Sequence, residues 1–145
     1  MKNFILLLLL ICSASIVAQG GDRDEKIKAF KTAYFTEALS LTTAEAEKFW
    51  PIYNKYDDSM DALRSKERAE VWSYFKRGLD EVSEEKANTL IDKIVFYDSE
   101  ELKYKQQLYQ DLKKVISSRK ILKLRKAEHD FKRRLLEEYK KRRRD

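Results

Sequence analysis

Residues 41–60 read LTTAEAEKFWPIYNKYDDSM, and this stretch decides the fold. Thr42 is a suitable helix N-cap, because its hydroxyl can accept a hydrogen bond from an unpaired backbone N–H, and Glu45 can reach back to the N–H of the cap. Pro51 lies inside the helix and predicts a bend near residues 48–50. After the cap, apolar residues recur at steps of three and four: Ala46, Phe49, Tyr53, Tyr56, Met60 and Leu63. This stripe predicts a long helix that needs other helices against it.

Caps and apolar spacing predict further helices on both sides of this one. A first helix covers about residues 24–39, after a short flexible lead. The central helix covers residues 43–77, and Trp72 and Phe75 extend its apolar face. We expect Gly78 to close it, because glycine readily takes the left-handed backbone at a helix C-terminus.

The C-terminal half predicts one or two more helices. Ser83 caps the third helix, and the fourth starts at Ser117 or Ser118. The two could instead form one rod, because residues 115–120 contain no Gly or Pro. We expect the third helix to bury Ala87, Leu90, Ile94, Tyr97, Leu108 and Leu112, with Ile91, Val95 and Leu102 widening that face. The stripe of the fourth helix is Ile121, Leu124, Ala127, Phe131, Leu135 and Tyr139.

The composition also favours helices. The chain has three Gly, one Pro and 39% charged residues, whereas sheet proteins need more turn residues. We therefore predict an all-α fold of three to four long amphipathic helices, in which the kinked second helix packs on the third as an antiparallel hairpin.

The N-terminus has the pattern of a secretory signal peptide, residues 1–18. Lys2 precedes an apolar run that ends in small residues before Ala18. The run is too short for a spanning helix, and Ile11 is too large to precede a lipidated Cys12. We expect export to the periplasm, and a single domain over residues 19–145 with a basic C-terminal tail. Removal of Cys12 would leave that domain without cysteine.

The sequence gives little sign of catalysis, and we expect no enzyme and no cofactor. Carboxylate pairs such as Glu84–Glu85 are adjacent on helices and point about 100° apart. His129, the only histidine, is flanked by acids on a charged face, so we expect it to be exposed. We expect no metal site: His and Cys are too few, and carboxylate-only binding has no loop motif behind it.

The charge and the aromatic residues point instead to binding. From Lys113 onward, Lys and Arg far outnumber Asp and Glu. Export argues against nucleic acid, so the basic helix is either a solvated face or a surface for acidic or unfolded polypeptides or anionic lipids. Exposed members of the pairs Phe49–Trp50 and Tyr74–Phe75 could add an interface. The candidate basic surface is Arg119, Lys123, Lys126, Lys132, Arg133 and Arg134.

Residues 41–45, Leu-Thr-x-x-Glu, resemble the Leu-Thr-x-x-Gln motif of the Spy/CpxP superfamily of small periplasmic helical proteins. Glu45 stands where the family has Gln, a change that keeps the capping role. The wider run 41–56 and the segment 120–133 are similar to a branch identified as a sensor associated with an extracytoplasmic-function sigma factor. The motif residues that we expect to be structural caps or core are Leu41, Thr42, Glu45, Phe49, Trp50, Pro51 and Tyr53.

The resemblance implies about four helices, often in a dimer, and one of three family roles. Metal-responsive members use His and Cys ligands that are not evident here. The first remaining role is an ATP-independent chaperone of the stress response that binds unfolded or acidic polypeptides. The alternative is a periplasmic sensor that binds a membrane signalling protein. We expect a homodimer and no nucleic-acid partner, and we rank the chaperone role first because a basic, aromatic-rich surface suits many clients.

Overall fold

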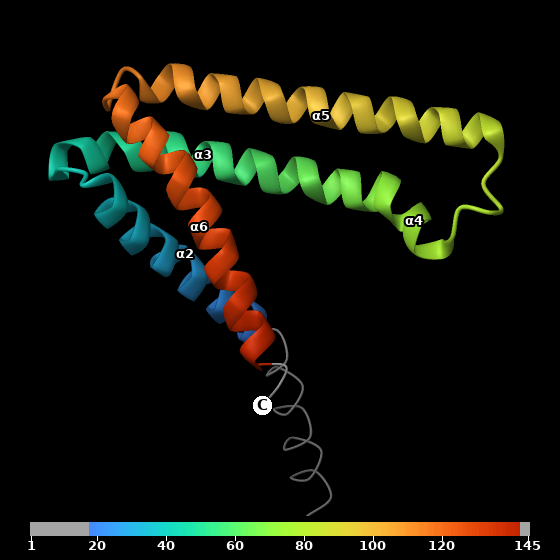
Figure 1. The fold of residues 1–145 in the computed structure, drawn as a ribbon, viewed down its shortest axis with the longest axis horizontal. Coiled ribbons are helices and arrows are strands. Elements are labelled where there is room, and N and C mark those ends of the chain that lie inside the picture. Colours follow the sequence, from blue (N-terminus) through green and yellow to red (C-terminus); the bar gives the residue numbers. More distant parts are fainter. Residues whose placement is uncertain (1–17, 143–145) are drawn as a thin grey trace, which may run out of the picture. The chain divides into compact units, whose positions relative to one another are not determined.

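The computed structural model describes residues 18–142, and this part of the chain is all-α, as predicted. The elements, labelled in Figure 1, are α2 (Ala18–Leu39), α3 (Thr43–Glu67), a π-helical segment η2 (Arg68–Trp72), α4 (Ser73–Arg77), α5 (Glu84–Leu112) and α6 (Ser118–Arg142). None of the described residues forms a strand. The predicted signal peptide, except for Ala18, and residues 143–145 of the basic tail lie outside the described residues.

Residues 41–122 form one compact unit, which we call the hairpin unit. Its two long helices, α3 and α5, lie side by side and run in opposite directions (Figure 1), so the predicted hairpin is confirmed. The seam buries Phe49, Tyr53, Met60 and Leu63 of α3 and Leu90, Tyr97, Leu108 and Leu112 of α5. Removing these side chains from water stabilises two helices that would be marginal alone.

Hydroxyl side chains cap the helices of the hairpin unit where the sequence predicts them. Thr42 Oγ1 accepts a hydrogen bond from the backbone N–H three residues later, at 3.2 Å. Ser83 Oγ makes the same contact at 3.3 Å, and Ser117 Oγ makes it at 3.4 Å. Each hydroxyl satisfies one of the backbone donors that the first turn of a helix leaves unpaired.

α5 and α6 are separate helices, so the structure decides between the two alternatives that the sequence left open. The backbone N–H groups of Val115 and Ile116 both donate to the carbonyl oxygen of Leu112, at 2.9 and 2.8 Å. This tight turn ends α5 without Gly or Pro. Ile116 becomes buried there, and Ser117 then caps α6, so burial and capping replace the usual turn residues.

The two special backbone residues of the second helix behave differently. α3 continues through Pro51, and both Pro51 and Glu47, whose carbonyl loses its N–H partner, are exposed. Gly78 closes α4 as predicted, with φ of 100°. Its ψ of 149° places it outside the left-handed helical region that the sequence predicts, although the positive φ still favours glycine.

One turn of the second helix is π-helical, which the sequence did not predict. In η2 the N–H that follows the segment reaches back five residues to the carbonyl of Arg68. The wider turn holds one extra residue and changes the register beyond it. In this segment Val71 is fully buried against Leu63 and Tyr97, whereas the neighbouring Trp72 is at the surface.

Residues 18–40 and 123–142 belong to a second compact unit, which we call the aromatic unit. Phe131 of α6 lies against three rings of α2, with centroid distances of 5.4 Å to Phe30, 6.0 Å to Tyr34 and 5.7 Å to Phe35. Ring pairs at these separations add to the burial of apolar area. The predicted α6 stripe is buried at Ile121, Leu124, Ala127 and Phe131 and reaches the surface at Tyr139.

The start of α2 differs from the prediction. α2 covers Ala18–Leu39, so the described residues before Asp24, part of which we expected to form a flexible lead, are helical. A helix that is already nucleated gains one backbone hydrogen bond for each residue added, so it can extend beyond its apolar stripe.

Candidate functional site

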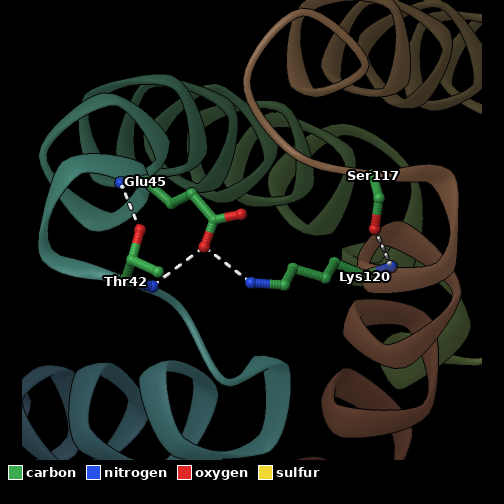
Figure 2. Close-up of polar contacts among 4 residues, drawn as sticks. All are labelled: Thr42, Glu45, Ser117 and Lys120. Carbon is green, nitrogen blue, oxygen red and sulfur yellow. Dashed lines mark hydrogen bonds and ion pairs between the residues drawn. The ribbon is translucent and has the colours of Figure 1, made fainter.

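The Leu-Thr-x-x-Glu motif forms a closed hydrogen-bonded junction, drawn in Figure 2. Thr42 Oγ1 accepts from the N–H of Glu45 at 3.2 Å, and Glu45 Oε2 accepts from the N–H of Thr42 at 2.8 Å. Lys120 Nζ donates to the same Oε2 at 2.6 Å. The capping box of α3 is therefore tied to the first turn of α6.

This junction controls the ionisation of Glu45. The hydrogen bond from Lys120 and, after it, the bond from the Thr42 backbone lower the pKa of the Glu45 carboxyl below its ordinary value of 4.5. The side chains of Glu45 and Lys120 are only 24% and 20% exposed, so water screens this pair less than it screens a surface ion pair. The arrangement holds two charges in fixed positions and leaves no unpaired nucleophile, which is consistent with a structural role for the motif.

The remaining motif residues are packing residues or lie at the surface. Phe49 and Tyr53 are buried, and their rings stack at 5.5 Å with an interplanar angle of 10°. Trp50 is half-buried and meets Phe49 edge to face at 5.0 Å. Leu41 is half-buried, and Pro51 is exposed. The motif thus fixes where α3 begins and how its first turns pack.

All six residues of the predicted basic surface lie on α6 and are exposed. Three of them already have partners. Asp130 pairs with Lys126 at 2.6 Å and with Arg133 at 3.5 Å, and the hydrogen bond from Lys126 lowers the pKa of the Asp130 carboxyl. The Arg134 guanidinium lies 4.8 Å from the centroid of the Tyr34 ring, a cation–π contact.

The other three basic residues are Arg119, Lys123 and Lys132. None of them forms an ion pair or a side-chain hydrogen bond with any of residues 25–141, whose side chains the structure describes. Arg119 and Lys123 are one helical turn apart, so they present two free cations on one side of α6. These cations, and not the full set of six, are available to an acidic partner.

The end of the hairpin carries large apolar side chains at the surface. We call Trp72, Tyr74, Phe75 and Leu79 the tip cluster. Trp72 and Phe75 are 49% and 42% exposed, and their ring centroids are 5.0 Å apart. The exposure is a correction, because the sequence pattern placed both side chains on the buried face. No described helix covers this side of η2 and α4, whose main contacts are with each other and with α3.

Cations border the tip cluster. Arg77 and Lys86 lie over the Tyr74 ring, at 5.3 and 4.8 Å from its centroid. Trp72 Nε1 donates to Glu67 Oε1 at 3.1 Å, so the indole is held in place while its ring stays exposed. The adjacent pair Tyr74–Phe75 was the one sequence signal for this surface, because two neighbouring helical residues cannot both point inward.

One apolar flank of α5 is exposed, contrary to the sequence prediction. We expected Ile91, Val95 and Leu102 to widen its buried face, but their exposed fractions are 57%, 62% and 55%. They project from a flank that no described helix covers, since the seam with α3 takes only the side that carries Leu90 and Tyr97. The apolar face of α5 is therefore wider than the partner helix.

The part of the chain that the structure describes contains no group of three His, Cys, Asp or Glu side chains placed to hold a metal ion. His129 is exposed beside Asp130, as the sequence predicts. No helix within residues 18–142 is both long and apolar enough to cross a membrane.

Comparison of the chain with protein-family models, with curated protein sequences and with solved structures gave no match. The resemblance to the Spy/CpxP superfamily therefore stays a prediction, based on residues 41–56 and 120–133.

Proposed function

We propose that this protein is a non-enzymatic binding protein of the periplasm that holds unfolded polypeptides without ATP, as chaperones of the Spy/CpxP superfamily do. One observation carries the proposal: the tip cluster exposes an adjacent Trp and Phe beside cations. Monomeric soluble proteins rarely expose contiguous large apolar side chains without a partner for them.

The tip cluster suits a chain that has not folded. Trp72 and Phe75 offer flat, rigid apolar surfaces that can cover exposed apolar side chains of many sequences. Tyr74, with Arg77 and Lys86 over its ring, adds cations that can pair with acidic residues next to those apolar segments. Such contacts need no defined client structure, so they favour broad binding over recognition of one partner.

The free cations of α6 support the same function in another way. Arg119, Lys123 and Lys132 have no acidic partner among the described residues, so their charge can act on an approaching chain. Long-range attraction accelerates the encounter with acidic segments and weakens as salt screens it. Release would follow from weak binding and from folding of the client, which buries the segments that the tip cluster held.

The test is an aggregation assay with several unrelated unfolded clients and the mature protein at near-equimolar amounts. We expect broad suppression of light scattering that falls as salt is added. The variant Trp72→Ser/Phe75→Ser should lose most of the suppression. Because both side chains are exposed, circular dichroism should show that the variant keeps the helical content of the parent protein.

The matched control is Ile91→Ser/Val95→Ser, which removes two exposed apolar side chains from α5 and leaves the tip cluster intact. We expect this control to keep suppression. Equal loss in both variants would show that any exposed apolar area is sufficient and would overturn the assignment to the tip cluster. No suppression with any client, together with one protein recovered by crosslinking in the cell envelope, would favour the sensor role.

A further inference from the structure

A groove runs between α3 and α5 near the end where α5 turns into α6. Its volume is about 460 Å³, within the range of sites that take small molecules. It lies entirely within the hairpin unit. The lining residues are Pro51, Ile52, Lys55, Tyr56 and Ser59 of α3 and Tyr104, Gln107, Leu108 and Asp111 of α5.

The walls of the groove are mainly apolar. Tyr56 and Tyr104 contribute rings from opposite helices, and Leu108 and Ile52 contribute aliphatic surface between them. The Ser59 hydroxyl donates to the carbonyl oxygen of Lys55 at 2.8 Å, so it has no proton left to donate to a ligand. The interior thus favours an aliphatic or aromatic ligand body over a polar one.

Two charged groups line the groove, and they differ in how they are paired. Asp111 is bonded at both carboxylate oxygens, to Gln107 Nε2 at 2.8 Å and to Lys114 Nζ at 3.0 Å. These bonds, the one from Gln107 first, keep the pKa of the Asp111 carboxyl below its ordinary value, and the charge of Lys55 acts in the same direction. The acid is therefore ionised and already has its partners.

Lys55 has no such partners. Its side chain makes no hydrogen bond and no ion pair with any of residues 25–141, and the Tyr104 hydroxyl makes no hydrogen bond with them either. The groove therefore offers one ammonium group, which acts on Asp111 only through its charge, and one hydroxyl group beside apolar walls. The ammonium group can only donate and the phenol hydroxyl is able to donate, so together they can bind an anion.

We propose that this groove binds an apolar molecule with one anionic head group, of the alkyl carboxylate class. The carboxylate lies at Lys55 and Tyr104, and the alkyl chain covers Tyr56, Leu108 and Ile52. A cationic head group is disfavoured, because Lys114 already pairs with Asp111 and the charge of Lys55 also acts there. The site is separate from the tip cluster, so the inference goes beyond the proposed polypeptide binding.

Isothermal titration calorimetry with the mature protein tests the head group. The ligands are dodecanoate, dodecyltrimethylammonium and dodecanol, which share a twelve-carbon chain; the two ionic ligands are kept below their micelle concentrations and dodecanol below its solubility limit. We expect dodecanoate to bind with one site and at least tenfold more tightly than the other two. Similar affinity for all three ligands, or no binding of dodecanoate at millimolar concentration, would overturn the proposal.

Three variants locate the site. Lys55→Gln should weaken dodecanoate binding by about tenfold, the effect of losing a hydrogen bond to a charged group. Lys48→Gln, at an exposed lysine on the same helix but outside the groove, should leave the affinity unchanged. Ser59→Phe should fill the groove and abolish binding while the helical content stays the same. Equal effects of the two lysine variants, or full binding by Ser59→Phe, would place the ligand outside this groove and overturn the proposal.

Discussion

Lys120 and Glu45 lie 75 positions apart in the chain, yet Lys120 Nζ is 2.6 Å from Glu45 Oε2. The same Glu45 oxygen accepts the N–H of Thr42, so one carboxylate closes the capping box of α3 and holds the start of α6. A residue whose local role is capping therefore also fixes a tertiary contact. The first two predictions separate these roles.

The variant Glu45→Gln keeps a side chain that can cap α3 but removes the charge that pairs with Lys120. Since the pKa of Glu45 is lowered on folding, its charge stabilises the folded state above about pH 4.5, and that contribution is lost as pH falls through the lowered pKa. We expect the variant to be less stable than the parent protein at pH 7. In acid the stabilities of the two proteins should become similar. Urea titrations from pH 7 to pH 3 measure the difference.

The control is Glu47→Gln, because Glu47 is exposed and outside the capping box. The difference in unfolding free energy between this control and the parent protein should not depend on pH in the same way. A constant difference between the Glu45→Gln variant and the parent protein over the whole range would mean that the ion pair with Lys120 does not contribute.

Removing the Thr42 hydroxyl tests the cap itself. Thr42→Ala should lower the free energy of unfolding by about 1 kcal/mol, because one backbone donor at the start of α3 loses its acceptor. Thr42→Ser keeps the acceptor and should cost much less. Thr43→Ala, one residue into the helix, serves as the control, and a cost equal to that of Thr42→Ala would argue against a capping effect.

Phe49 is fully buried and stacks on Tyr53, so Phe49→Ala should cost about 3–5 kcal/mol of unfolding free energy. The loss combines removal of apolar burial with the cavity left behind. Chemical denaturation followed by far-UV circular dichroism measures it. A cost near zero would mean that the α3 seam is not packed as described.

Leu90 and Ile91 are neighbours on α5 with opposite surroundings, 5% and 57% exposed. Leu90→Ala should cost about 2–5 kcal/mol, because Leu90 lies in the seam. Ile91→Ala should be close to neutral, because alanine is the better helix former at an exposed site. Thermal melts of the two variants compare them directly. A larger loss of melting temperature for Ile91→Ala than for Leu90→Ala would mean that Ile91 is buried, as the sequence suggested.

The π-helical turn predicts an unusual tolerance to deletion. Removing Ala69 from η2 takes out the extra residue and should leave a regular α-helix with Leu63 still facing the seam. Removing Ala62 from α3 should destabilise strongly, because it rotates all later positions of that helix by about 100°. Both alanines are exposed, so neither deletion removes a core side chain. Equal loss of melting temperature in the two deletions would contradict this account.

The sequence by itself determined the helical class and most helix ends. Thr42, Ser83 and Ser117 act as caps, and Gly78 ends α4, as their types and positions indicate. Capping, helical spacing and the backbone freedom of glycine depend on residues within about four positions, so a single chain reveals them. The packing of Phe49 and the exposure of His129 follow from the same local periodicity.

Only the tertiary structure decided which apolar residues are buried. Leu90 and Ile91 are both apolar and point about 100° apart, and the position of α3 alone determines that Leu90 lies in the seam. Val71 is likewise buried against Tyr97 of α5 while its neighbour Trp72 is exposed, and the position of α5 determines which of the two lies in the seam. Contacts such as Lys120–Glu45 depend on helices meeting across the fold, and helical periodicity carries no information about which helices will meet.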